Sequence, residues 1–70
     1  MAISYKKLWK LLIDKDIKKL QLRDKIEISN STLSKLSKNE HVALTVLEKI
    51  CKELNCDFKD IIEYIPNEKE

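Results

Sequence analysis

The fold is decided by residues 22–39, which read LRDKIEISNSTLSKLSKN. This stretch has the pattern of a helix end, a tight turn and a second helix. From Asn30 to about Ser37 only Leu33 and Leu36 are apolar, and they lie three residues apart. One narrow apolar seam therefore holds the second helix, and most of its circumference is exposed. A helix with so polar a surface usually binds a partner outside the fold.

Both ends of this helix carry boundary signals. Ser29 is a good N-cap, and Ile28 can pack against Leu33 as a hydrophobic staple. Asn39 follows the helix, and in a chain without glycine it is well suited to the left-handed conformation that ends a helix. These signals predict a helix from residue 30 to about residue 37.

Apolar residues at helical spacing predict two helices before Ser29. Ser4 can cap a first helix that runs to about Lys15, and a short second helix is expected from about Lys18 to Ile26. Their expected core-facing residues are Tyr5, Leu8, Trp9, Leu12, Leu22 and Ile26. Because Tyr5 and Trp9 share this stripe with leucines, we interpret them as core residues rather than as platforms for stacked bases.

Two more helices are predicted toward the C-terminus. A fourth helix is expected from about Ala43 to Leu54, ended by Asn55 in the left-handed conformation. Asp57 and Asp60 resemble a capping box that opens a fifth helix to about Tyr64. The expected inward-facing residues are Leu44, Leu47, Ile50, Cys51 and Leu54 in the fourth helix, and Phe58, Ile61, Ile62 and Ile65 in the fifth.

The whole chain is therefore predicted to be all-α, a compact five-helix bundle. It has 70 residues, no glycine and one proline, a composition that suits helices and lacks the residues that hairpins require. A chain this short holds one core, so we expect one domain at residues 1–66 and a charged tail at residues 67–70. No apolar run is long enough for a membrane span and no signal segment is evident, which favours a cytoplasmic protein.

The residue types needed for catalysis or metal binding do not cluster. There is no glycine-rich phosphate loop and no nucleophile beside a base, and His41 has no neighbouring ligands. Cys51 and Cys56 are five residues apart, a spacing that fits neither a redox pair nor a zinc half-site, so we expect reduced packing thiols. We expect no enzyme activity, no metal and no cofactor.

The charge is distributed unevenly along the chain. The net charge is +2, but residues 1–40 hold ten Lys and Arg against five Asp and Glu, whereas residues 41–70 hold four against seven. The first part therefore carries +5 and the second −3. This segregation favours a basic half that faces a polyanion.

Residues 22–39 resemble the signature of the Cro/repressor-type, or XRE-like, helix-turn-helix family. Residues 44–55, LTVLEKICKELN, match the fourth helix of that family, and residues 5–14, YKKLWKLLID, resemble its short stand-alone bacterial and phage members. The resemblance implies a lambda-repressor-like DNA-binding domain of five helices. It also implies a sequence-specific transcriptional regulator that inserts the helix at about 30–37 into the major groove of double-stranded DNA.

Two departures from the family pattern matter. Glu27 stands in the turn where the family has glycine, and a left-handed glutamate costs roughly 1 kcal/mol. Lys18 and Lys19 stand where members often carry threonine and glutamine. This exchange removes a side-chain cap and adds two positive charges, which suits a site beside a phosphate backbone.

By family position, Asn30, Ser31 and Lys35 are expected to meet base edges. Asparagine can donate and accept at adenine, lysine donates to guanine, and serine serves either base. The residues expected to contact the DNA backbone are Lys10, Lys18, Lys19, Ser29, Thr32, Ser34, Lys38, Asn39 and Thr45. The plainer interpretation is that Ser29 and Asn30 only cap the helix while the lysines keep the protein soluble.

Two further questions stay open from the sequence. A protein-interaction module, antitoxin-like or adaptor-like, can keep this fold without DNA specificity, because fold alone does not define function. The other question is whether the chain forms a homodimer. Ile61, Tyr64 and Ile65 form the patch expected to join the two copies. Burial in the core explains the two isoleucines equally well.

Overall fold

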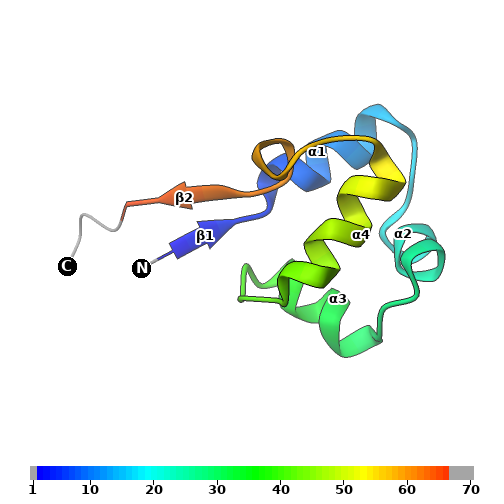
Figure 1. Cartoon of the computed structure of the whole chain (residues 1–70), viewed down its shortest axis with the longest axis horizontal. Coiled ribbons are helices and arrows are strands. Elements are labelled where there is room, and N and C mark those ends of the chain that lie inside the picture. The colour runs from blue at the N-terminus through cyan, green and yellow to red at the C-terminus, as the bar shows by residue number, and fades with distance from the viewer. Residues whose placement is uncertain (1, 67–70) are drawn as a thin grey trace.

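The computed structural model describes residues 2–66 and contains four α-helices and one small sheet (Figure 1). The helices are α1 (Lys6–Asp14), α2 (Lys19–Ile26), α3 (Asn30–Ser37) and α4 (Leu44–Leu54). A 3₁₀ turn, η1 (Phe58–Asp60), follows α4, and the strands are β1 (Ala2–Ser4) and β2 (Glu63–Ile65). The predicted tail at residues 67–70 lies outside the described residues. Among the described residues, no helix is long and apolar enough to cross a membrane.

One hydrophobic core holds the helices together. Its buried side chains are Tyr5, Leu8, Leu12, Leu22, Ile26, Leu36, Leu47, Ile50, Leu54 and Ile61. This set confirms most of the inward faces predicted from helical spacing, with Trp9 and Cys51 half-buried at the rim. The prediction was wrong for Leu44, which is the first residue of α4 and lies 65% exposed at the edge of the core. It was also wrong for Phe58, which is exposed in the short turn after α4.

The predicted fifth helix is wrong. Asp57 and Asp60 do form a local cap, in which the Asp57 N–H donates to Asp60 Oδ2 at 3.0 Å, but this cap opens only the short turn η1. The chain then extends as β2, which pairs antiparallel with β1 so that Ile3 lies opposite Tyr64. Four of residues 61–65 are β-branched or aromatic, and these residue types favour the extended form. The fold is therefore four helices with a two-stranded ribbon, and not an all-α five-helix bundle.

The two strands form a ribbon that extends from the helical body, with β1 and β2 side by side (Figure 1). β1 is the more buried strand, since Ser4 is buried and Ala2 and Ile3 are half-buried. All three residues of β2 are exposed. An isolated two-stranded ribbon is marginally stable in water, so the packing of Ile3 against the core helps to hold this one.

Residues in the left-handed conformation end several helices. Asn39 has φ 60° after α3 and Asn55 has φ 55° after α4, as predicted for both. Glu27 has φ 58° after α2, so the turn takes up the left-handed glutamate in spite of its cost and is not adjusted to avoid it. Asp16, at φ 59° after α1, was not predicted. At Glu27 the reversal lets the Ile28 N–H donate to the Arg23 carbonyl at 3.2 Å, which turns the chain sharply from α2 into α3.

The start of α1 differs from the prediction. Ser4 lies in β1 and the N-cap is Tyr5, although Ser4 Oγ still accepts a hydrogen bond from the Lys6 N–H at 3.1 Å. The Tyr5 N–H donates to Asn39 Oδ1 at 3.0 Å, and the Tyr5 hydroxyl donates to the Glu40 carbonyl at 2.7 Å. The beginning of α1 is therefore fixed by the segment that follows α3.

Candidate nucleic-acid interface

The helix-turn-helix consists of α2, the turn at residues 27–29, and α3. Helix α2 packs against α4 and α3, and α3 lies at the lower edge of the molecule in Figure 1. On α3 only Leu36 is fully buried, while Leu33 and Thr32 are half-buried and the other five residues are exposed. This arrangement confirms the narrow seam predicted from the sequence and leaves a broad polar face on α3.

The N-terminus of α3 is capped as predicted. Ser29 Oγ accepts a hydrogen bond from the Thr32 N–H at 3.1 Å and also lies 3.1 Å from Thr32 Oγ1. The first N–H groups of an α-helix have no intrahelical carbonyl partner, so those of Asn30 and Ser31 are available beside this cap. Together with the positive end of the helix dipole, they suit an anionic group such as a DNA phosphate.

The first residue of α3 is held by a residue of α2. Asn30 Oδ1 accepts a hydrogen bond from Nη1 of Arg23, while Arg23 Nη2 and Nε donate to Asp24 Oδ1 at 3.0 and 3.1 Å. Arg23 was not singled out from the sequence as the residue that holds Asn30. The available signal was that it is the single arginine in a chain of lysines and lies in the last turn of α2, next to the turn.

The two lysines at the start of α2 lie in different environments. Lys18 is the N-cap and makes no side-chain cap, as predicted, but its N–H donates to Gln21 Oε1 at 2.8 Å. This chain has Lys18 where members of the family often carry a capping threonine. Gln21 thus supplies part of the capping that the lysine cannot. Lys19 Nζ lies 4.1 Å from the centroid of the Trp9 ring, a cation–π contact that joins the start of α2 to α1.

The end of α3 faces the ribbon across an open groove of 670 Å³. Lys35 and Lys38 line the α3 side of this groove together with Asn39 and His41, and Ala2, Ile3 and Ile65 line the ribbon side. Asn39 Oδ1 is already engaged by the Tyr5 N–H. Asn39 therefore has only its amide N–H groups left for a phosphate.

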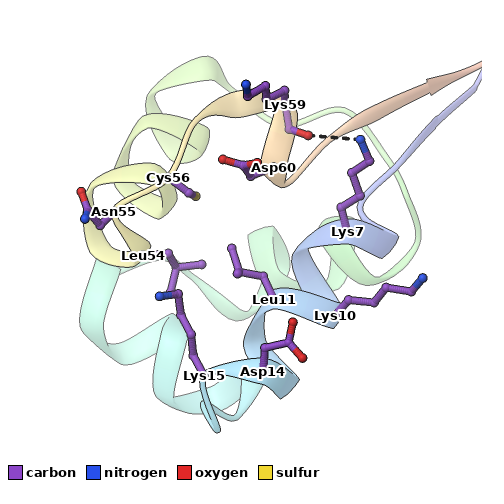
Figure 2. Close-up of a pocket in the computed structure, with 10 residues that line it drawn as sticks. All are labelled: Lys7, Lys10, Leu11, Asp14, Lys15, Leu54, Asn55, Cys56, Lys59 and Asp60. Carbon is purple, nitrogen blue, oxygen red and sulfur yellow. Dashed lines mark hydrogen bonds between the residues drawn. The ribbon is translucent and has the colours of Figure 1, made fainter.

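Thr45 and Lys10 are the expected contact residues that lie outside the helix-turn-helix, on α4 and α1. Thr45 is exposed in the first turn of α4. Lys10 lines a different groove, between α1, the end of α4 and η1, whose other lysines are Lys7, Lys15 and Lys59 (Figure 2). Figure 1 shows η1 and α3 on opposite sides of α4, so the structure does not group Lys10 with the polar face of α3.

The charge of the α3 face is positive. Residues 29–38 contain Lys35 and Lys38 and no carboxylate. Asp24 pairs with Arg23 at 3.0 Å, and the exposed Glu27 and Glu40 lie outside the two ends of this segment. A surface with donors and cations but no carboxylate suits a polyanion.

Other chemistry has little support in the described residues. Across residues 2–66, no three His, Cys, Asp or Glu side chains gather into a group that suits a metal ion. Cys51 and Cys56 are free and half-buried. Burial, with a smaller effect from Cys56, raises the pKa of the Cys51 thiol to about 11, and burial also raises the pKa of Cys56. Both thiols are therefore neutral and weakly nucleophilic near pH 7.

Comparisons with known proteins agree with this geometry. Residues 7–67 match the family described as the Cro/C1-type HTH DNA-binding domain. The chain is also similar to the crystal structure, form II, of the transcriptional regulator VanUg, with 61% sequence identity and a TM-score of 0.92. That similarity covers 94% of this chain and 88% of the other. A comparison with curated proteins finds no match.

Proposed function

Because the chain belongs to the Cro/C1-type helix-turn-helix DNA-binding family, we propose that it is a transcriptional regulator that reads the major groove with α3. One observation carries this function: α3 exposes a polar, carboxylate-free face and is held to the core by a single buried side chain, Leu36. A helix of this kind fits the major groove, where side chains near its N-terminus reach base edges.

Asn30, Ser31 and Lys35 are the proposed base readers. All three are exposed on α3, and Asn30 and Ser31 lie in its first turn. Their amide, hydroxyl and ammonium groups match the acceptors and donors of the major-groove edges.

The remaining polar groups around α3 are the proposed backbone contacts. Ser29, Thr32, Ser34, Lys38 and Asn39 belong to α3 and its two ends, whereas Lys18, Lys19 and Thr45 stand at the starts of α2 and α4. Such contacts position the protein without reading sequence. We propose Lys10 only as a peripheral contact, since it lines the groove beside η1.

Selection from random duplex DNA tests this function. The protein is expected to enrich a defined sequence in a band-shift selection, and its affinity is expected to fall steeply between two salt concentrations because phosphate contacts release counterions. A folded protein that binds no duplex, or binds without salt dependence, would point to the rival class, a protein-interaction module with this fold. The lysines on α3 and the absence of carboxylates there do not favour that rival.

The Lys38→Ala variant separates backbone contact from base reading. Lys38 is exposed at the end of α3, and losing one phosphate contact reduces the slope of log K against log salt by about 0.9. Binding is expected to weaken equally for all sequences, so the selected motif stays the same. Titrations of the selected duplex at four salt concentrations measure the slope.

Lys59→Ala is the matched control for Lys38→Ala. Lys59 is also an exposed lysine, but it lies in η1, on the opposite side of α4 from α3. The control is expected to keep the wild-type slope. If Lys38→Ala and Lys59→Ala change the slope equally, Lys38 holds no specific phosphate.

The proposed dimer uses the exposed edge of β2. Of the patch expected from the sequence, Ile61 is wrong because it is fully buried, but Tyr64 and Ile65 are 66% and 41% exposed on β2. An exposed edge strand is a template for a second strand, and a second copy of this chain can pair with it around a two-fold axis. A three-residue strand buries far less than the roughly 1,200 Å² of a stable interface, so we propose that the dimer assembles only on DNA.

Cooperative binding tests the dimer. The wild type is expected to be monomeric at micromolar concentration by sedimentation and to bind two adjacent half-sites cooperatively. The Tyr64→Lys/Ile65→Lys variant is expected to keep its affinity for one half-site and lose at least about tenfold in cooperativity, since like charges then face each other across the edge. Unchanged cooperativity in this variant excludes β2 as the contact.

We also propose where the protein works and that it is not an enzyme. A regulator of this kind acts on chromosomal or phage DNA, which places its work in the cytoplasm. We propose no enzymatic activity, because the family and the similar structure are those of DNA-binding regulators.

A further inference from the structure

We infer that Arg23 is a positioning residue that makes Asn30 prefer guanine over adenine. The inference rests on the proposed function, in which Asn30 meets a base edge. It comes from the hydrogen bond between Arg23 Nη1 and Asn30 Oδ1, which joins the last turn of α2 to the first residue of α3.

Local structure brings these two side chains together. The left-handed Glu27 reverses the chain, and the Ile28 N–H bonds back to the Arg23 carbonyl at 3.2 Å. The start of α3 is thereby placed beside the end of α2. The Arg23 side chain is only 26% exposed, and Asp24 Oδ1 holds its Nη2 and Nε at 3.0 and 3.1 Å. Arg23 is therefore itself oriented.

The chemistry of the pair fixes the direction of the Asn30 amide. A guanidinium has donors and no acceptor, so the group that faces it must be the amide oxygen and not the NH₂. Arg23 thus occupies one acceptor position of Asn30 Oδ1 and places a positive charge beside that oxygen. The NH₂ group of Asn30 stays free to donate.

This arrangement changes which base Asn30 reads. Bidentate reading of adenine needs the amide oxygen to accept from the N6 amino group while the NH₂ donates to N7. The charge of Arg23 disfavours a second donor at that oxygen. Guanine presents two acceptors, O6 and N7, and needs only donors. Arg23 therefore shifts Asn30 from the adenine expected for a free asparagine to guanine.

Selection with Arg23 variants tests the inference. The position read by Asn30 is identified as the one that loses enrichment in Asn30→Ala. The wild type is expected to select guanine there. Arg23→Gln removes the positive charge beside Oδ1 and offers both a donor and an acceptor, so it no longer holds the Asn30 amide in one direction. The guanine-to-adenine ratio is therefore expected to fall by about tenfold, within the range that one bidentate contact gives. Arg23→Lys keeps a donor-only side chain and is expected to keep guanine.

Lys25→Gln is the matched control. Lys25 lies on the same helix and carries the same charge, but its Nζ lies 3.7 Å from Glu53 Oε2 on α4 and not at Asn30. It is expected to keep most of the affinity and to leave the selected base unchanged. A purely structural role for Arg23 lowers thermal stability in Arg23→Gln and leaves the base preference unchanged.

The outcomes separate the inference from the function on which it rests. If the wild type selects adenine at this position, the inference is wrong, whether or not Arg23→Gln folds. If Arg23→Gln folds and keeps guanine, it is also wrong. In both cases an enriched motif that depends on Asn30 still supports the regulator. A wild type that enriches no sequence overturns the proposed function and the inference together.

Discussion

The Asn30→Ala/Lys35→Ala variant is expected to bind the selected site no more tightly than random duplex. Each good base contact gives about 1–3 kcal/mol of discrimination, so the loss of two lowers specific affinity by roughly 30-fold to more than a thousandfold. Both side chains are exposed, and alanine favours the helix, so the fold is expected to stay intact. Band shifts on specific and random duplexes at one salt concentration measure the effect.

A second double variant controls for lost charge. Lys49→Ala/Lys52→Ala removes two exposed lysines from α4, which border a groove with Lys25 and Glu53 rather than α3. This variant is expected to keep the motif and most of the specific affinity. Should Asn30→Ala/Lys35→Ala behave like it, α3 is not the helix that reads the bases.

Of the substitutions proposed here, Leu36→Ala is expected to lower the stability of the fold most. Leu36 is 0% exposed and is the single buried side chain of α3, so its truncation leaves a cavity between α3 and the core. Leucine-to-alanine changes at such sites lower the free energy of unfolding by about 2–5 kcal/mol. In a domain of this size each 1 kcal/mol lowers Tm by about 4–8 °C. Thermal unfolding followed by circular dichroism measures the shift.

The same substitution at Leu44 is the control. Leu44 is 65% exposed at the start of α4, and its truncation leaves no internal cavity. Its effect on the free energy of unfolding is expected to stay within about 0.5 kcal/mol, as for most surface changes. An equal loss of stability in Leu36→Ala and Leu44→Ala would contradict the conclusion that Leu36 holds α3 to the core.

The sequence was informative wherever the cause of structure is local. Ser29 caps α3 through the nearby Thr32 N–H, and Asn39 and Asn55 adopt the left-handed conformation predicted for them. These features depend on residues within five positions of each other. The bounds of α3 and its narrow seam followed from the same local pattern.

The sequence was misleading where the partner is distant. Residues 61–65 carry apolar side chains at positions 61, 62 and 65, which fit helical spacing as well as a strand. Pairing with β1 decided in favour of the strand, and Ile3 and Tyr64 are 61 positions apart. The start of α1 was misjudged for the same reason, because the Tyr5 N–H bonds to Asn39.

The candidate site was only partly predictable. The polar face of α3 follows from the sequence, and the roles of its individual residues remain predictions. The link between Arg23 and Asn30 was not predicted, since it depends on the angle at which α3 leaves the turn at Glu27. The contact of Lys19 with Trp9 likewise requires the packing of α2 against α1.

The pairing of β1 with β2 sets an order of events during synthesis. Among residues 2–66, β1 is synthesised before the helices and β2 after them, so this sheet can form only once β2 has left the ribosome. Most of the core is present earlier, because nine of the ten buried core residues of the described chain lie at or before Leu54. A nascent chain that ends after α4 therefore contains α3 and most of its core, while Ala2–Ser4 still lacks its neighbouring strand. The ribbon is therefore the last of the described elements to be completed.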